Sequence, residues 1–267
     1  MSWKKGFTIV TKVFLVGLGI LFLLFSIRQV TMIWVTGRLH KVAETDHFVF
    51  YATDEDKGLY SSGFLADRDL TFDRISSDLN YQSDQKIIHR LFPSMRLLHL
   101  SWGNPFEWPV DSVGNSFILE IRELSPYSAD WIKYPKISDS NIFAHELTHV
   151  MTGEINPDRH QTWLIEGLAV YEQTEGRAGP YFKTLLHEHV VQDEAPDLNQ
   201  LTGQTLWNFI EKHGYDYGYT VVEYVVQSYG KDKLAELART AADSDTYFGM
   251  SAADFWEGWM VYLKENY

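Results

Sequence analysis

Five consecutive residues, His145-Glu146-Leu147-Thr148-His149, carry the side chains that a hydrolytic metal site requires. Side chains four residues apart lie one above the other on a helix, so both imidazoles could reach a single Zn²⁺ ion. The glutamate between them would face a water molecule that the ion activates, and could take its proton. If this segment is helical, the pattern H-E-x-x-H predicts a catalytic zinc site.

Signals at both ends of the pattern indicate a helix. Ser138-Asp139-Ser140 offers side chains that cap a helix N-terminus, and Gly153 followed by Asn156-Pro157 offers a stop. A helix over residues 141–152 would be about three turns long and would carry both histidines.

Glu166 is the candidate third ligand, because a catalytic zinc needs three protein ligands and one open position. It lies 17 positions beyond His149, inside a second helical pattern that runs from Trp163 to Tyr171. A turn and a return of the chain could bring the first turn of that helix to the histidine pair. The competing interpretation, a glutamate that only interacts with the helix dipole, is disfavoured beside H-E-x-x-H.

Together these segments resemble the gluzincin metallopeptidases, in particular the bacterial peptidase MA-like domains, over roughly residues 45–265. The residues that carry the similarity are His145-Glu146-x-x-His149, Trp163-Leu164-x-Glu166-Gly167-Leu168-Ala169-x-Tyr171, Tyr219-x-x-x-x-Tyr224, Tyr229-Gly230-Lys231 and Phe255-Trp256-Glu257. The resemblance implies an α+β, zincin-like fold. It would have a small N-terminal α/β lobe, a mainly helical C-terminal lobe and an active-site cleft between them.

The resemblance also implies roles for the matching residues. His145, His149 and Glu166 would bind Zn²⁺, and Glu146 would act as general base and proton shuttle. The implied activity is the zinc-dependent hydrolysis of peptide bonds in a peptide or protein substrate.

A tyrosine of the helical lobe would stabilise the oxyanion of the reaction. Tyr219 matches that position best, and Tyr215 and Tyr217 are alternatives. A core aromatic residue on a helix is the competing interpretation of Tyr219.

Two departures from related enzymes narrow the implied activity. Thermolysin-like enzymes have an aspartate four residues after the ligand glutamate, where it orients a zinc-binding histidine, and here that position is Val170. The partner of this histidine must therefore come from elsewhere. Aminopeptidases of the group carry a G-x-M-E-N strand that binds the free amine of the substrate, and residues 114–118 do not match it. An endopeptidase is therefore favoured over an aminopeptidase.

Hydrophobic patterns predict the elements around this site. We expect strands at 47–52, 86–92 and 116–122, with Gly114 to Ile121 at the edge of the sheet. We expect further helices at 59–79, 95–102, 181–191, 217–228, 231–241 and 251–264. The first of these has an apolar stripe formed by Leu65, Leu70, Phe72, Ile75 and Leu79. Without repeats or a long linker, residues 41–267 are predicted as one peptidase domain, with the α/β lobe and zinc helix in 41–152 and the helical lobe in 153–267.

Residues 1–40 have a different composition. Lys4, Lys5 and Lys12 precede 15 uncharged residues at 13–27, and extension back to Phe7 gives 21 residues, enough to span a bilayer. We interpret this segment as an uncleaved signal anchor, with a cleaved signal peptide and a buried core helix as the alternatives. With the lysines inside, the body of a single-pass membrane protein would lie outside the cytoplasm.

The charge of the body excludes some classes of partner. All 36 acidic residues follow residue 40, where only 18 of the 23 basic residues lie, so a nucleic-acid partner is disfavoured. The chain has no cysteine, so a metal site must use histidine and carboxylate ligands. A structural zinc site is disfavoured because such sites usually have four protein ligands. The alternative to an enzyme is a catalytically idle zincin fold that serves as a binding or sensing domain at the cell surface.

Overall fold

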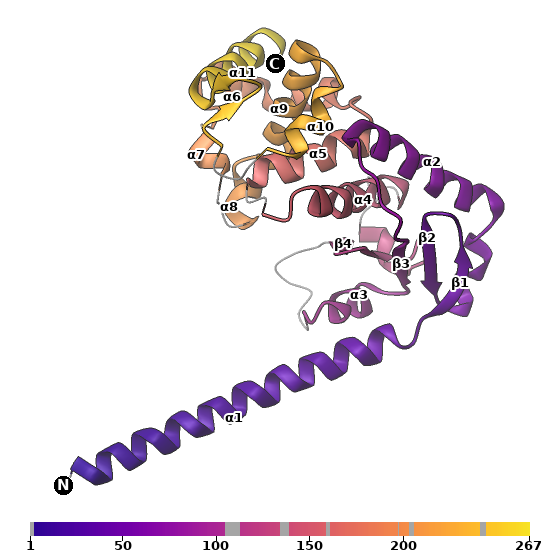
Figure 1. Cartoon of the computed structure of the whole chain (residues 1–267), viewed down its shortest axis with the longest axis vertical. Coiled ribbons are helices and arrows are strands. Elements are labelled where there is room, and N and C mark those ends of the chain that lie inside the picture. The colour runs from indigo at the N-terminus through magenta and orange to yellow at the C-terminus, as the bar shows by residue number, and fades with distance from the viewer. Residues whose placement is uncertain are drawn as a thin grey trace.

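A computed structural model of the chain describes residues 3–104, 113–133, 139–158, 161–196, 198–202, 206–240 and 244–267. It shows a mixed α+β protein that is mostly helical, with a long apolar helix at its N-terminus (Figure 1). The strands gather on one side of the body and the C-terminal helices on the other. Helix α4 (Asp139–Ile155) lies between these two groups and contacts both.

The main sheet has five strands in the order β1-β2-β3-β5-β4. β2 and β3 are parallel, as are β3 and β5, whereas the edge strands β1 and β4 are antiparallel to their neighbours. The five strands are β1 (His40–Glu44), β2 (Phe48–Ala52), β3 (Ile87–Phe92), β4 (Gly114–Phe117) and β5 (Glu120–Leu124). The strands expected at 47–52 and 86–92 are therefore present, and β1 was not predicted.

The single strand predicted at 116–122 is wrong. The chain turns at Ile118 and Leu119, which divides this segment into β4 and β5. Leu119 has φ of 55°, a left-handed conformation that usually requires glycine or asparagine, so the turn carries none of the usual sequence signals. The predicted edge at 114–121 is correct for β4 only, since β5 lies inside the sheet.

Helix α2 (Ser62–Leu79) connects β2 to β3. Ser61 caps its N-terminus by accepting a hydrogen bond from the Phe64 amide, and Asn80 ends it in a left-handed conformation. The predicted apolar stripe is wrong at Leu70, which is 68% exposed, because the buried face instead continues through Arg68.

The helices expected at 95–102, 163–171, 181–191, 217–228, 231–241 and 251–264 are present, with boundaries that differ by a few residues. The short helical segments at 54–59, 129–133, 198–201 and 206–211 were not predicted. The helical elements besides α2 and α4 are α1 (Trp3–Thr36), η1 (Asp54–Leu59), α3 (Met95–Ser101), η2 (Ala129–Lys133), α5 (Thr162–Thr174), α6 (Gly179–Val191), α7 (Leu198–Leu201), α8 (Leu206–Glu211), α9 (Gly214–Tyr229), α10 (Lys233–Ala238) and α11 (Ala252–Asn266). A short hairpin of β6 (Thr246–Tyr247) and β7 (Met250–Ser251) precedes α11. Ser138, part of the predicted cap of α4, lies outside the described residues.

Two clusters of buried apolar side chains hold the body together. The larger one joins sheet residues such as Phe48 and Ile121 to α4 through Phe143 and Leu147, and continues into α5, α9 and α11. The smaller one, which we call the second core, consists of Val35, Leu39, Phe92, Met95, Leu98, Val113, Leu124 and Ile142. Helix α4 belongs to both, so the position of this helix is fixed from two sides.

Candidate active site

The three residues expected to bind a metal lie together. His145 and His149 are one turn apart on α4, and Glu166 comes from the first half of α5. Helix α5 packs between α4 and α9, and glycines allow the second of these contacts. A Cβ atom on Gly167 would lie 2.4 Å from the carbonyl oxygen of Gly218, so the two backbones can touch only without side chains there.

The distances among the three candidate ligand atoms can be compared with those around a metal ion. The Nε2 atoms of His145 and His149 are 3.1 Å apart, and Glu166 Oε2 lies 3.3 Å and 3.4 Å from them. A tetrahedral Zn²⁺ ion with bonds of about 2.0–2.1 Å separates its ligand atoms by roughly 3.3 Å. The three side chains could therefore hold such an ion with little rearrangement.

His145 has the hydrogen-bonding partner that Val170 could not provide. Its Nδ1 atom lies 3.0 Å from Oε1 of Gln173, seven residues after Glu166 on the same helix. An Nδ1–H that donates to this amide oxygen leaves the Nε2 lone pair directed towards Glu166 and His149. Gln173 was not predicted, although spacings of three, four and seven place residues on one face of a helix.

Glu146 is buried between α4 and the edge strand β4. Its side chain accepts a hydrogen bond from Ser116 of β4, and a Cβ atom on Gly114 would lie 2.9 Å from Glu146 Oε1. Burial raises the pKa of Glu146, and the charges of His149 and His145 and the Ser116 bond only partly oppose this increase. This carboxyl group therefore has a raised proton affinity, as a general base requires.

The three candidate ligands, His145, His149 and Glu166, form a group whose charges depend on one another. Burial tends to raise the pKa of Glu166, but the charges and hydrogen bonds of His149 and His145 lower it well below its usual range. Burial tends to lower the pKa of His145, but its bond to Glu166 and that carboxylate's charge raise it overall. A proton bound by the histidines thus balances the negative charge of the buried Glu166 carboxylate. A bound cation could replace that proton.

The candidate tyrosines occupy different environments along α9. The ring of Tyr215 lies 6.4 Å from the ring of His145, and its pKa is raised by burial and by the charges of Glu166 and Glu146. The hydroxyl of Tyr215 is therefore protonated at neutral pH, and it lies within electrostatic range of Glu166 and Glu146.

Tyr219, the residue preferred from the sequence, is directed elsewhere. It is fully buried, its ring packs against Tyr171 and Phe182, and its hydroxyl donates to Glu223 Oε1 at 3.0 Å. The structure does not bring it to the histidine pair. Tyr217 is also buried and packs edge-on against Trp259.

A groove of about 500 Å³ begins at His149 and follows the edge of the sheet. One wall is formed by β4 and its turn, the other by the C-terminal half of α4 and the loop after it. The lining residues are Ser116, Phe117, Ile118, His149, Val150, Gly153, Glu154 and Pro157. A peptide in extended conformation could lie in such a groove beside an edge strand.

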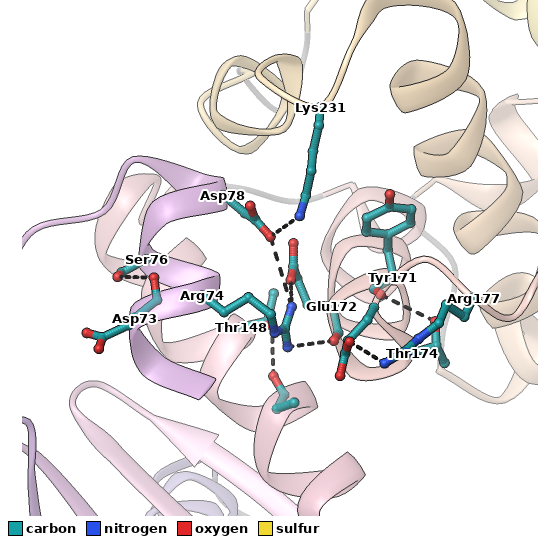
Figure 2. Close-up of polar contacts among 12 residues, drawn as sticks. Asp73, Arg74, Ser76, Asp78, Thr148, Tyr171, Glu172, Thr174, Arg177 and Lys231 are labelled. Atoms are coloured by element: carbon teal, nitrogen blue, oxygen red, sulfur yellow. Dashed lines mark hydrogen bonds and ion pairs between the residues drawn. The ribbon is translucent and has the colours of Figure 1, made fainter. Parts of the chain in front are cut away.

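A network of ion pairs joins α2 to α5 through Arg74 and Glu172 (Figure 2). Glu172 is buried, and Arg74 of α2 pairs with its carboxylate and donates to its backbone carbonyl at 2.9 Å. Asp78, also on α2, pairs with Lys231 at 2.7 Å. Burial raises the pKa of Glu172 to about 7, Asp78 adds to this increase, and Arg74 opposes it. The network fixes the end of α5 that carries Gln173.

A second buried pair lies within the sheet and joins the neighbouring strands β3 and β5. His89 Nε2 of β3 lies 2.7 Å from Glu123 Oε2 of β5, and both side chains are buried. Burial raises the pKa of Glu123 to about 8, the charge of Arg68 opposes this, and the charge of Glu146 adds to it. Glu123 therefore lies within electrostatic range of Glu146, and sequence patterns gave no sign of this.

Residues 130–255 match a protein family described as Peptidase MA superfamily. The match supports a peptidase MA-like domain, and a peptidase domain implies peptide or protein substrates. Peptidases of this superfamily are generally metal-dependent, and the matched segment contains the His145, His149 and Glu166 group. No curated protein and no solved structure matches the chain.

Proposed function

We propose that this protein is a membrane-anchored zinc metallopeptidase that hydrolyses peptide bonds outside the cytoplasm. One observation carries the proposal: three ligand atoms from His145, His149 and Glu166 have the mutual distances of a tetrahedral site. The neighbouring buried carboxyl of Glu146 supports a catalytic rather than a purely structural site. With α4 between the sheet and the helices, the arrangement supports a zincin-like fold for residues 41–267, with the α/β lobe and zinc helix in 41–152 and the helical lobe in 153–267.

In this proposal His145, His149 and Glu166 would hold a zinc ion, and the chemistry supplied there would be Lewis acidity towards a peptide carbonyl and a water molecule. Glu146 accepts the proton of the attacking water and passes it to the leaving amine. The Ser116 side chain donates a hydrogen bond to the Glu146 carboxylate and so orients it. Gln173 orients the ring of His145 so that Nε2 is free to bind.

We assign the oxyanion donor to Tyr215 rather than to Tyr219. Tyr215 is near His145 and its raised pKa keeps the hydroxyl protonated, so it can donate a hydrogen bond. The hydroxyl of Tyr219 already donates to Glu223.

The substrate would lie in the groove beside β4. The backbone of this edge strand can pair with an extended peptide, and the groove continues past His149 towards Pro157. Residues 114–118 do not resemble the strand that binds a free amine in aminopeptidases, which supports an endopeptidase.

Residues 1–40 would form the anchor. In the described part of the chain, Val13–Thr36 is the one helix long and apolar enough to cross a membrane, a property that a signal sequence shares. The helix runs without a break into contacts with the body, which favours an uncleaved anchor. Lys4, Lys5 and Lys12 before this segment favour a cytoplasmic N-terminus and an extracytoplasmic body.

The test combines metal analysis with a substitution. Purified full-length protein in detergent should contain close to one zinc per chain and cleave an unstructured protein such as casein. Glu146→Gln should keep the zinc and lose hydrolysis, whereas Glu188→Gln, on the exposed side of α6, should change neither. Equal hydrolysis by Glu146→Gln would refute the mechanism. Zinc bound with no hydrolysis of any protein by the native chain would support the idle binding domain instead.

A further inference from the structure

Helix α1 is longer than a bilayer needs and is attached to the body without a linker. Its 34 residues extend about 51 Å, against about 30 Å for the hydrocarbon core of a membrane. Figure 1 shows the N-terminal part of α1 extending away from the molecule, while its last third runs beside α3. The next strand, β1, begins only four residues after α1 ends.

One face of the last third of α1 is joined to the body. Arg28 Nη2 donates to the carbonyl oxygen of Trp102 at 3.0 Å, and Nε donates to that of Gly103 at 3.3 Å. Gly103 has φ of 79°, and a Cβ atom there would lie 2.1 Å from Arg28 Nε. The absence of a side chain at Gly103 therefore leaves space for the guanidinium. Further along the same face, Val35 is buried in the second core.

The opposite face of this segment is apolar and uncovered. Val30 is 65% exposed, Ile33 is 69% exposed and Trp34 is 55% exposed. The guanidinium of Arg38 lies 4.8 Å from the ring of Trp34. An aromatic residue beside a cation at the end of an apolar helix is typical of a membrane–water interface.

Helix length places the bilayer boundary at Trp34. The 22 residues from Val13 to Trp34 extend about 33 Å, which matches the hydrocarbon core with a slight tilt. Arg28 lies six residues before Trp34, about 9 Å below it along the helix axis. The C-terminal end of α3, which binds Arg28, must then also lie below the level of Trp34.

We infer that the body is docked directly on the lipid bilayer through a surface formed by Val30, Ile33 and Trp34 of α1 and by Trp102 to Asn104 at the end of α3. The partner is the outer part of the lipid bilayer, where the headgroups meet the acyl chains. The inference rests on the proposed anchor, but it adds that the body has a fixed orientation. The carbonyls of Trp102 and Gly103 compensate the charge of Arg28, which would otherwise be costly at this depth.

The charge distribution along the chain favours lipid contact through α1 over contact through the rest of the body. From residue 41 onward the acidic residues outnumber the basic ones two to one, so anionic lipids would repel most faces of the body. Residues 3–40 contain no acidic residue.

Because the chain has no cysteine, single cysteines can carry a fluorescent label without other changes. Labels would be placed at Ile20, Ile33, Asn104 and, as a distant control on α10, Glu236. Each labelled full-length protein would be reconstituted into phosphatidylcholine vesicles that contain phosphatidylcholine with a nitroxide quencher, either at the headgroup or on the acyl chain. We expect the acyl-chain quencher to reduce the fluorescence of the labels at Ile20 and Asn104, because Asn104 follows the carbonyls that bind Arg28. We expect the headgroup quencher to reduce the fluorescence of the label at Ile33, next to the boundary at Trp34. The label at Glu236 should keep its fluorescence.

The substitution Arg28→Gln tests the docking itself. It should restore the fluorescence of the Asn104 label while the Ile20 label stays quenched, because the helix remains inserted but the body is released. Continued quenching of Asn104 in this variant would overturn the role of Arg28.

The remaining outcomes separate the two proposals. An Asn104 label that is never quenched, beside a quenched Ile20 label, would overturn the docking and leave the anchor intact. An Ile20 label that is not quenched would overturn both. A protected Ile33 label beside a quenched Ile20 label would overturn the lipid contact of this face, because a second copy of the chain would then cover it.

Discussion

Gln173 offers the sharpest test of how the candidate metal site is built. Gln173→Ala removes the acceptor 3.0 Å from His145 Nδ1 without touching a ligand atom. The ring of His145 is mostly buried, so its N–H would lose a partner that water cannot easily replace. An unpaired buried donor costs about 1–3 kcal/mol, and loss of such outer partners lowers metal affinity by about 10–100-fold.

The affinity can be measured on apo full-length protein in detergent, by competition for Zn²⁺ with a chromophoric chelator. We expect Gln173→Ala to weaken zinc binding by about 10–100-fold, which corresponds to about 1.4–2.7 kcal/mol. Gln173→Glu should stay close to the native affinity, because a carboxylate oxygen can accept the same bond. Gln192→Ala, an exposed glutamine at the end of α6, is the matched control. Unchanged affinity in Gln173→Ala would refute the orienting role.

Three further predictions concern the tyrosines and the two buried acidic groups. Tyr215→Phe should lower kcat by about 10²–10³-fold, which is the usual effect of losing an oxyanion donor. Tyr219→Phe should leave kcat unchanged and lower the free energy of unfolding by about 1 kcal/mol, because its hydrogen bond to Glu223 is lost. Arg74→Met should lower the free energy of unfolding by about 3 kcal/mol at pH 8 and by less at pH 6, because Glu172, with a pKa raised to about 7 by burial, can then bind a proton. Glu123 has its pKa raised by burial from 4.5 to about 8, so its contribution to stability is complete below about pH 4.5 and is lost as the pH rises through 8. Glu123→Gln should remove this dependence, whose slope is at most about 1.4 kcal/mol per pH unit.

Steady-state kinetics and denaturant unfolding at several pH values check these three predictions. A loss of kcat in Tyr219→Phe but not in Tyr215→Phe would return the oxyanion role to Tyr219. Equal destabilisation of Arg74→Met at pH 6 and pH 8 would contradict a shifted pKa at Glu172. Parallel stability profiles of the native protein and Glu123→Gln would show that Glu123 keeps its ordinary pKa in the fold.

Local patterns identified the helices of the site because both α4 and α5 combine an apolar face with end signals. The hairpin of β4 and β5 escaped prediction because its turn consists of Ile118 and Leu119, two residues that ordinarily belong inside strands. Strand β1 escaped because none of its five side chains is fully buried at this sheet edge and three of them are polar, which leaves no alternating pattern.

Within the site, sequence spacing could pair His145 with His149 and suggest Glu166, because these spacings follow from one helix and one return of the chain. Sequence spacing could not tell which of Tyr215 and Tyr219 lies near His145, because both are on the same face of α9. The answer depends on which turn of α9 packs against α5, and the close contact of Gly167 with Gly218 sets this position. The role of Gln173 likewise depends on which turn of α5 faces His145, and this is a tertiary property.

The contact between Gly167 and Gly218 also determines which parts of the site can move. Glu166 and Tyr215 lie on two helices whose backbones touch, so neither helix can slide without lifting away from the other. The two helices that carry these side chains therefore move together as one unit. The groove itself lies between α4 and the β4 strand with its turn, and this turn places Ile118 88% exposed to solvent. Because such an exposed turn has few packing contacts, the hairpin is the side of the groove that can open to admit a peptide.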